Sequence, residues 1–254
     1  MMNKVFVGLP CYNEEKDINT LLTRILNLKE TIKTKFGLEM IIFCVNDGSK
    51  DKTEEIIKQR ENEGIYLINH DTNKGLGEAM RTIFREFISK GTKNDYLIVM
   101  DSDNSHNPNY IIDLIEKQNQ NKPDIVIASR YQKGAKIKGL KKYRILLSDL
   151  AKIWYTKMLR IPNVQDYTCG YRLYTYDIVV NTYKKYNENI ITQTNFACMM
   201  EILYKMFLSG ASISEIPFLL EYNLKVGTSK MKVVKTSINS LITTFKIKKL
   251  GEQK

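Results

Sequence analysis

The sequence predicts an α/β fold with a mostly parallel central sheet that helices cover on both faces. Short apolar runs alternate with longer amphipathic stretches from the first residues onward, which is the rhythm of successive β-α units. The apolar runs contain almost no polar residues, as expected for strands that are buried on both faces of a parallel sheet. A length of 254 residues suits one large domain.

Five apolar runs in the first half of the chain are the expected strands, and a segment with helical spacing follows each of the first four. Within residues 14–28, for example, Ile18, Leu22 and Ile25 fall on one helical face. The expected strands are residues 4–9, 40–45, 65–69, 96–100 and 124–129. The expected helices are residues 14–28, 52–62, 75–90 and 110–118.

After Lys142 the pattern changes. The expected elements are a long helix over residues 143–159, a glycine-containing turn over 165–174, a helix over 197–209 and a strand over 213–219. The chain shows no internal repeat and no low-complexity linker. We therefore expect one domain over residues 1–230, followed by a basic amphipathic C-terminal helix or tail over residues 231–254.

The chain is strongly basic. Its 39 lysines and arginines exceed its 28 aspartates and glutamates by 11, which favours polyanionic partners such as nucleic acid, anionic lipid or phosphate-bearing small molecules. The basic residues are dispersed, whereas acidic residues cluster at the expected strand ends, where they would repel a phosphodiester backbone. The sequence therefore disfavours nucleic acid as a partner.

Cysteine spacing and hydropathy predict the compartment. The four cysteines have no paired spacing, which indicates reduced thiols in a cytoplasmic protein. No signal peptide is expected, because Pro10 and two glutamates stand where its apolar core would continue. No segment approaches the roughly 20 apolar residues that a spanning helix needs. Any membrane contact is therefore expected to be peripheral, on the cytosolic face.

Two carboxylates follow the fourth expected strand. In parallel sheets, ligands bind beyond the carboxyl ends of the strands. Asp101 and Asp103 stand one residue apart at such an end, and their mutual repulsion favours a cation beside them. Carboxylates and the oxygen donors after them suit Mg²⁺ or Mn²⁺, which bind a few carboxylates plus phosphate oxygens. The alternative is a solvated turn in which Asp103 is the N-cap of the next helix.

Other strand ends carry groups suited to a nucleotide and to phosphate. Asp47 is placed to accept a hydrogen bond from a nucleobase N–H, while Asp51 is the expected cap of the following helix. Arg130 ends the fifth strand, and Arg144 and Ser148 lie one helical turn apart on one face. These groups can hold phosphate by hydrogen bonds, although isolated basic residues of this kind are more often plain surface residues.

Taken together, these motifs resemble the family 2 glycosyltransferases with the GT-A fold, in particular the polyprenyl-phosphate (dolichol-phosphate) mannosyltransferase and glucosyltransferase branch. The resemblance extends from Val5 to about Met231. Nine motifs in order carry it: GLPCYNEE, VNDGSKDKT, NKGLGEAMR, MDSDNSHNP, ASRYQKG, the R-x-x-x-S pair, QDYTCGYRLY, EIPF and VGTSKM. One such motif alone is weak evidence, but nine in sequence are specific.

The resemblance implies a sugar nucleotide over the strand ends, with Mg²⁺ or Mn²⁺ on its diphosphate. It assigns substrate binding to Pro10, Tyr12, Asn13, Glu14, Asp47, Lys74, Ser229 and Lys230. In that set, Asp47 would read the base, and Ser229 and Lys230 would belong to a late loop that closes over the donor phosphates. The resemblance assigns the metal to Asp101 and Asp103; Ser105 stands where some relatives offer a glutamine, so the next ligand is expected to be Ser105, with His106 or water as alternatives. The reaction is expected to use Asp101, Asp103, Arg130, Arg144 and Ser148, with Asp166 as a further catalytic candidate.

The acceptor decides whether a general base is needed. By the same resemblance, Arg130, Arg144 and Ser148 would bind the phosphate of a polyprenyl phosphate. The oxygen of this phosphate is already anionic at neutral pH. A hydroxyl acceptor on a glycan, lipid or protein would instead require a carboxylate base, for which Asp166 and Glu201 are the candidates. The alternative for each carboxylate is structural, for example an ion pair between Asp166 and Arg172.

The expected activity is inverting transfer of a hexose, mannose or glucose, from a GDP- or UDP-sugar to a polyprenyl phosphate. In the tail, apolar residues recur at heptad-like spacing among lysines. These apolar residues are Met231, Val234, Ile238, Leu241 and Phe245. Such a helix either lies in a membrane interface or packs on the domain. A membrane-protein partner is a further candidate.

Overall fold

The computed structural model describes residues 2–224, 226 and 233–252, with side chains in the last stretch from 241 to 250. Its main sheet has seven strands in the order β3-β2-β1-β4-β7-β5-β8. The strands are β1 (Asn3–Cys11), β2 (Leu38–Asn46), β3 (Ile65–Asn69), β4 (Tyr96–Val99), β5 (Ile125–Ser129), β7 (Arg172–Thr175) and β8 (Ile213–Pro217). Only β7 runs antiparallel to its neighbours, β4 and β5. The predicted mostly parallel sheet is confirmed.

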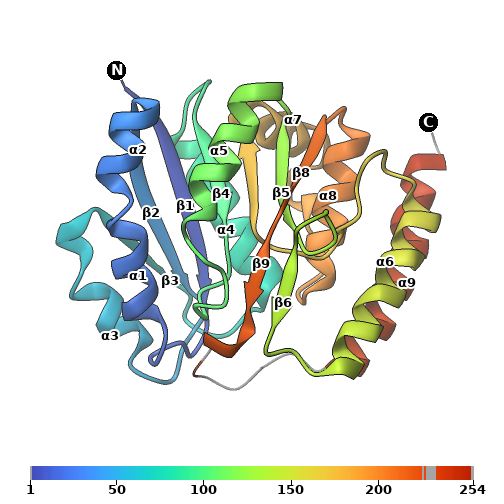
Figure 1. Ribbon diagram of the computed structural model, residues 1–254, viewed down its shortest axis with the longest axis horizontal. Helices are drawn as coiled ribbons and strands as arrows, with labels where there is room; N and C mark the ends of the chain where they lie inside the picture. The colour runs from blue at the N-terminus through green and yellow to red at the C-terminus, as the bar shows by residue number, and fades with distance from the viewer. Residues whose placement is uncertain (1, 225, 227–232, 253–254) are drawn as a thin grey trace.

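Helices cover both faces of the sheet, as predicted. Helices α1, α2 and α5 lie on one face, and α4, α7 and α8 on the other (Figure 1). An ion pair between Lys35 and Glu116 joins α2 to α5. The helices with their bounds are α1 (Ile18–Leu26), α2 (Lys29–Phe36), α3 (Thr53–Lys58), α4 (Leu76–Lys90), α5 (Tyr110–Asn121), α6 (Lys142–Leu159), α7 (Tyr176–Tyr186), α8 (Ala197–Leu208) and α9 (Val233–Glu252).

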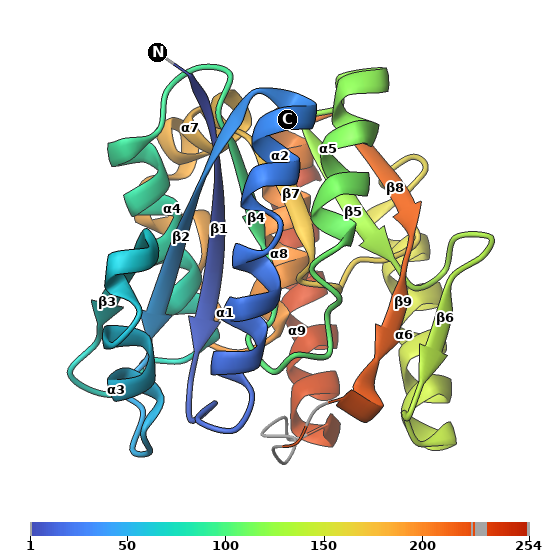
Figure 2. The same ribbon diagram turned by 60° about the vertical axis from the view of Figure 1, so that its left-hand side comes forward.

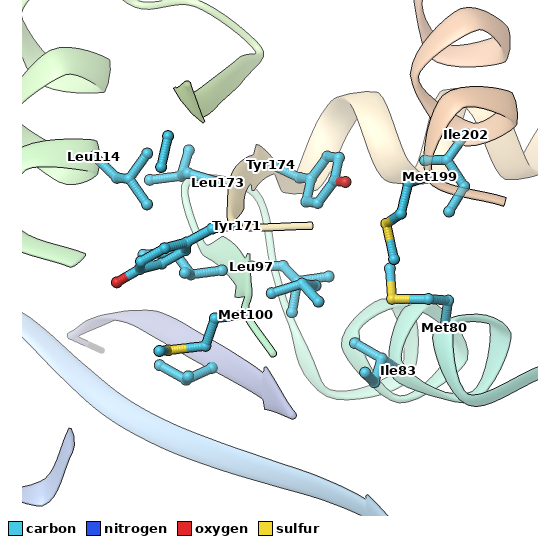
Figure 3. Packing of buried hydrophobic residues seen from close by; sticks show 14 of the residues in the cluster. Met80, Ile83, Leu97, Met100, Leu114, Tyr171, Leu173, Tyr174, Met199 and Ile202 are labelled. Carbon is cyan, nitrogen blue, oxygen red and sulfur yellow. The ribbon is translucent and has the colours of Figure 1, made fainter. Parts of the chain in front are cut away.

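The core lies on both sides of the central strands. Phe6 of β1 contacts Phe43 of β2 and, edge-on, Phe87 of α4. A Cβ at Gly8 would lie 2.6 Å from Cγ2 of Ile83, so a glycine in β1 lets α4 approach the sheet closely. Figure 3 shows the packing around β4 and β7, with the side chains of α4 and α8 meeting beside these strands. The apolar runs that predicted the strands are therefore the core itself.

The second half of the chain differs from the expectation in three places. The expected turn over 165–174 ends in β7, the unassigned residues after it form α7, and the expected strand over 213–219 divides into β8 and β9 (Leu219–Glu221). Strand β7 has four residues and begins with an arginine, which hides its strand character. Arg172 is nevertheless fully buried, because its guanidinium donates to the carbonyls of Tyr167 and Met199. In the first half, α2 is a separate helix that the sequence did not reveal.

A second layer of structure extends one end of the sheet. Strand β6 (Lys136–Lys138) pairs in parallel with β9. Helices α6 and α9 lie side by side at that end, as both views show (Figures 1 and 2), and the rings of Trp154 and Phe245 are 5.3 Å apart. In the described part of the chain, no helix is both long enough and apolar enough to cross a bilayer.

Candidate active site at the carboxyl ends of the strands

The loops that follow β1 and β2 are bonded to each other at the carboxyl edge of the sheet. The Asn13 amide donates to Oγ of Ser49 (2.9 Å), and the Lys50 amide donates to Oδ1 of Asn13 (2.7 Å). The Glu14 amide donates to Oγ1 of Thr53 (2.7 Å). Asn13 has a φ of 54°, a left-handed conformation that asparagine tolerates better than most residues. These bonds fix the loop that carries the predicted nucleoside contacts.

Asp47 is buried and organises the loop before α4. Its Oδ1 accepts hydrogen bonds from the Lys74 amide (2.9 Å) and pairs with Nδ1 of His70 (2.7 Å), and its Oδ2 accepts from the Gly75 amide (2.8 Å). The structure therefore gives Asp47 a role in holding the Lys74 loop, and its contact with a nucleobase stays a prediction. The expected cap of α3, Asp51, lies one residue before the N-cap, Lys52, and its Oδ1 accepts from the Thr53 amide at 3.0 Å.

The start of α4 is held from the other side by the segment before α8. The Gly77 amide donates to the Thr194 carbonyl (3.1 Å), and a Cβ at Gly77 would lie 1.8 Å from the Gln193 carbonyl oxygen. Glu201 fixes this segment, because it accepts from the amides of Thr192 (2.8 Å) and Gln193 (3.0 Å) and pairs with Nζ of Lys205 (2.6 Å). The structural alternative therefore fits Glu201 better than the role of a base.

The acidic loop after β4 is shaped by its own hydrogen bonds. The Asp101 amide donates to Nδ1 of His106 (3.1 Å), and the Asp101 side chain is 34% exposed. Oδ1 of Asp103 accepts from both the amide (3.1 Å) and the hydroxyl (2.5 Å) of Ser105. The N-cap of α5 is Asn109, so the alternative in which Asp103 caps this helix is wrong.

This loop fits a cation that is shared with a ligand. Asp101 and Asp103 offer carboxylate oxygens, and Mg²⁺ is commonly bound by one or two carboxylates together with substrate phosphates and water. Within the described residues, no group of three or more histidine, cysteine, aspartate or glutamate side chains is placed to hold a metal ion. Ser105 is buried, and its hydroxyl orients Asp103; its predicted contact with the metal stays a prediction.

Hydrogen bonds connect the acidic loop to both sides of the site. Oγ of Ser102 donates to the Pro10 carbonyl (2.7 Å), in the loop with the predicted nucleoside contacts. On the other side, the Glu221 amide donates to the Ser105 carbonyl (3.1 Å), and the next residue, Tyr222, contacts α6. The acidic loop is therefore the centre of one continuous edge.

On the other side of the acidic loop, Arg130 and Asp166 form a buried ion pair. Nε and Nη2 of Arg130 donate to the two carboxylate oxygens (2.8 and 2.7 Å), and the Arg130 amide donates to Oδ2 (3.0 Å). Burial alone would raise the pKa of Asp166, but the charge and hydrogen bonds of Arg130 outweigh burial and lower this pKa to about 2. Burial would likewise lower the pKa of Arg130, and Asp166 reverses this and raises it.

This geometry favours the structural alternative for Asp166. The side chain is fully buried, and the Cys169 amide also donates to its Oδ1 (3.0 Å), so both oxygens already accept hydrogen bonds. The sequence had suggested Arg172 as the ion-pair partner of Asp166. In the structure the partner is Arg130. The position also matters for Asp101: Gly170, four residues after Asp166, would place a Cβ 3.3 Å from Oδ1 of Asp101.

Helix α6 contributes a row of polar side chains to the same region. Nη1 of Arg144 donates to the Tyr222 hydroxyl (3.1 Å), and the hydroxyls of Ser148 and Tyr131 are 2.7 Å apart. Nζ of Lys152 lies 4.5 Å from the centre of the Tyr131 ring, a distance typical of a cation–π contact. The predicted pair of Arg144 and Ser148 therefore belongs to a larger basic cluster.

The structure brings most of the predicted site residues to one edge. Ser229 and Lys230 lie outside the described residues, as do Met231 and the side chains of Val234 and Ile238 in the tail. The Val226 amide donates to Oδ1 of Asp17 (3.1 Å), so the chain that leads to Ser229 starts beside the loop after β1.

Four residues of this region were missed by the sequence analysis. Tyr131 and Lys152 join the basic cluster, His70 binds Asp47, and Glu215 accepts hydrogen bonds from the amides of residues 165 and 166 (2.9 and 2.8 Å). Lys152 had a usable signal, because it follows Ser148 by four positions and so shares its helical face. Glu215 stands in the EIPF motif, but only the fold shows what it binds.

The sheet order and the acidic loop at the end of β4 are those of the GT-A fold. Solved structures agree on the fold. Glucosyl-3-phosphoglycerate synthase from Mycobacterium tuberculosis, in complex with Mn²⁺, UDP and phosphoglyceric acid, superposes with a TM-score of 0.67 over 97% of this chain and 78% of the other, at 16% identity. The expected GT-A fold is confirmed.

The chain belongs to glycosyl transferase family 2, whose model matches residues 6–207. It is 31% identical over 231 residues to the dolichol-phosphate mannosyltransferase of Pyrococcus furiosus. The matched region covers 90% of this chain and 59% of that relative. It is 27% identical over 230 residues to the undecaprenyl-phosphate mannosyltransferase of Micrococcus luteus. That match covers 90% of this chain and 87% of the relative. The chain thus spans about three fifths of the first relative. The resemblance seen in the motifs is confirmed at the level of the family.

Proposed function

We propose that this chain transfers a hexose, mannose or glucose, from a nucleoside diphosphate to a polyprenyl phosphate, with inversion at the anomeric carbon. The observation that carries the proposal is the position of the acidic loop. It is hydrogen-bonded to the Pro10 loop on one side and to β9 on the other. Tyr222, directly after β9, accepts a hydrogen bond from Arg144. A donor diphosphate and an acceptor phosphate would therefore meet over one edge. The names of the relatives from Pyrococcus and Micrococcus support a polyprenyl-type lipid acceptor.

The donor would bind over the carboxyl ends of β1, β2 and β4. Pro10, Tyr12, Asn13 and Glu14 would line the nucleoside, on a loop that is held in place before the ligand arrives. Asp101 and Asp103 would hold Mg²⁺ or Mn²⁺ against the diphosphate, and Mn²⁺ is present in the glucosyl-3-phosphoglycerate synthase complex. When bound, this ion offsets the negative charge that grows on the leaving nucleoside diphosphate.

The acceptor phosphate would bind beside α6. Arg144 and Ser148 lie on the helix face that meets Tyr131 and Tyr222, and Arg130 adds a cation held by Asp166. A phosphate oxygen would attack the anomeric carbon as the bond from that carbon to the diphosphate breaks. Because this oxygen is anionic at neutral pH, no general base is required, which agrees with the buried, hydrogen-bonded state of Asp166 and Glu201.

We also propose that the protein acts on the cytosolic face of a membrane, as a peripheral protein. The basic balance of the chain and the lipid acceptors in the relatives' names support this location. Whether the donor is a GDP- or a UDP-sugar is decided by experiment, since the neighbour complex with UDP and the mannosyltransferase relatives point to different sugars.

The test is hexose transfer to a short, water-soluble polyprenyl phosphate from GDP-mannose and UDP-glucose, each with Mg²⁺ and with Mn²⁺. Asp101→Ala and Asp103→Ala should each lower turnover about 1,000-fold or more, while the circular dichroism spectrum of the folded wild type is retained. The matched control is Asp177→Ala, because Asp177 is an exposed aspartate on α7, away from the carboxyl ends. Wild-type rates in both acidic-loop variants would refute the site assignment.

A further inference from the structure

The side of α6 that faces away from the domain is apolar and exposed. Tyr143, Leu146, Leu150 and Ile153 are 55%, 60%, 55% and 62% exposed, and their spacing of three, four and three residues places them in one stripe along the helix. We call these four residues the outer face of α6. Scattered apolar surface residues are ordinary, but a continuous stripe of this kind marks an interaction surface.

The surroundings of the outer face are basic. Residues 133–160 contain seven lysines and two arginines against one aspartate and no glutamate, so their net charge is +8. Lys141 and Lys142, at the start of α6, are both exposed. An apolar stripe with a basic rim complements an anionic lipid surface, whereas two copies of this chain that met through the same face would bring like charges together.

Helix α9 extends the outer face. Ile242 and Phe245 are 51% and 53% exposed, and Phe245 reaches α6 through its ring contact with Trp154. The buried side of α9 carries Thr244 and Ile247, which pack toward the domain. For the described residues, one side of α9 therefore packs on the domain, while Leu241 and Phe245 are exposed; that this side lies in a membrane interface stays a prediction.

The outer face lies across α6 from the predicted acceptor residues. At 100° per residue, Arg144, Ser148 and Lys152 fall about half a turn away from Leu146 and Leu150. A helix is about 10–12 Å across, and an interfacial helix buries its apolar side about 5–10 Å into the boundary between headgroups and acyl chains. A helix docked in this way would hold its opposite, polar side at the depth of lipid phosphates.

We propose that the outer face of α6, extended by Ile242 and Phe245 of α9, is the surface by which this protein docks on an anionic bilayer. Docking in this orientation places the row of Arg144, Ser148 and Lys152 level with the phosphate of a lipid acceptor that stays in the membrane. This inference rests on the proposed function for its purpose, but the docking itself is a separate property of the surface.

The experiment is flotation of the full chain with phosphatidylcholine vesicles, with and without phosphatidylglycerol, in the absence of donor and acceptor. The test variant combines Leu146→Ser, Leu150→Ser and Ile153→Ser. We expect its partition onto anionic vesicles to fall about 100-fold. Transfer to a short, water-soluble polyprenyl phosphate without vesicles should stay at the wild-type rate, since none of the three residues belongs to the acceptor cluster.

Two further variants define the surface. Tyr66→Ser removes a side chain of similar exposure (49%) from β3, at the opposite end of the sheet (Figure 1), and should leave vesicle binding unchanged. Lys141→Gln combined with Lys142→Gln should weaken binding roughly fivefold for each lysine at low salt, and less at high salt.

Three results would overturn the inference: no binding of the wild-type chain to anionic vesicles, equal binding by the triple variant, or a wild-type dimer that the triple variant abolishes. Because flotation needs neither substrate, the vesicle result stands even if the proposed transfer reaction fails. Conversely, normal transfer with no vesicle binding would reject the docking surface alone.

Discussion

Helix α4, on the donor side of the site, buries seven of its 15 residues, whereas α6, on the acceptor side, buries only Tyr155 and Leu159 of its 18. The loops around α4 are also tied to their neighbours through backbone amides, at Asp47 and at Gly77. On the proposed acceptor side, the contacts around Tyr131 are made by side chains: its hydroxyl meets that of Ser148, and its ring lies under Nζ of Lys152. The proposed nucleotide side is thus built into the core, while the proposed acceptor side is attached to the edge of the fold by a helix that buries few of its residues.

The strongest way to test this difference is to remove the buried anchor of the acceptor side. Asp166→Asn leaves Arg130, whose side chain is only 15% exposed, without its counter-charge, which should lower the free energy of unfolding by about 3–5 kcal/mol. Urea unfolding followed by circular dichroism measures this change. Asp149→Asn, at an exposed position on α6, is the matched control and should change stability by less than about 0.5 kcal/mol. Equal effects would mean that the pair does not hold this region.

Acid should weaken the same anchor. The pKa of Asp166 is lowered from 3.8 to about 2 in the folded chain, so its contribution to stability is present above pH 4 and is lost as the pH falls toward 2. The size of this contribution is about 2 kcal/mol. Unfolding free energies of the wild type and Asp166→Asn should therefore differ by a constant amount near neutral pH, and this difference should shrink by about 2 kcal/mol as the pH falls from 4 to 2. A difference that is independent of pH down to 2 would contradict the pairing.

On the donor side, the sharpest probe is the close approach at Gly77. Gly77→Ala places a methyl group where the Gln193 carbonyl lies, so the two segments must separate, at a cost of about 1–3 kcal/mol in stability. Alanine would otherwise favour the helix by about 1 kcal/mol. Thermal unfolding measures stability, and calorimetry measures the affinity for the nucleotide, which should also fall. Ser89→Ala, at an exposed position near the end of the same helix, should show neither effect.

The smallest expected effect concerns the acceptor cluster. Tyr131→Phe removes the hydroxyl that meets Ser148, and one hydrogen bond of about 1 kcal/mol should raise KM for the polyprenyl phosphate about fivefold. KM for the sugar nucleotide should not change, because the donor side is held by separate contacts. Tyr66→Phe is the control. Equal increases in both KM values would mean that Tyr131 supports the whole edge and not the acceptor side alone.

The same contrast explains what the sequence could predict. Strands such as β1 and β2 were visible because burial on both faces makes them continuously apolar. Helix α2 was missed because only Ile32 of its eight residues is buried, which leaves little amphipathic signal. Strand β7 was missed because its four residues include Arg172, whose guanidinium donates to the carbonyls of Tyr167 and of Met199, 27 positions away.

For the site, the first five motifs predicted which residues gather at the carboxyl edge, since each stands at the end of a strand or soon after it. The pairing within the site was harder to predict. Asp166 has Arg130 as its partner, 36 positions away, and nothing in the sequence distinguishes this arginine from Arg172. The ring of Tyr131 between charged side chains likewise depends on how α6 lies against the end of β5, which spacing along one element does not encode.

Strand β7 has one more consequence. Because it runs against its neighbours, the chain enters it from the carboxyl edge, where Arg172 pairs with Val99. The five residues from Asp166 to Gly170 therefore begin at the arginine salt bridge and finish against the carboxylate of Asp101. In the proposed function, Arg130 would bind the acceptor phosphate and Asp101 the metal on the donor diphosphate, so this short span would set the distance between the two. Inserting or deleting one residue there would then change that distance.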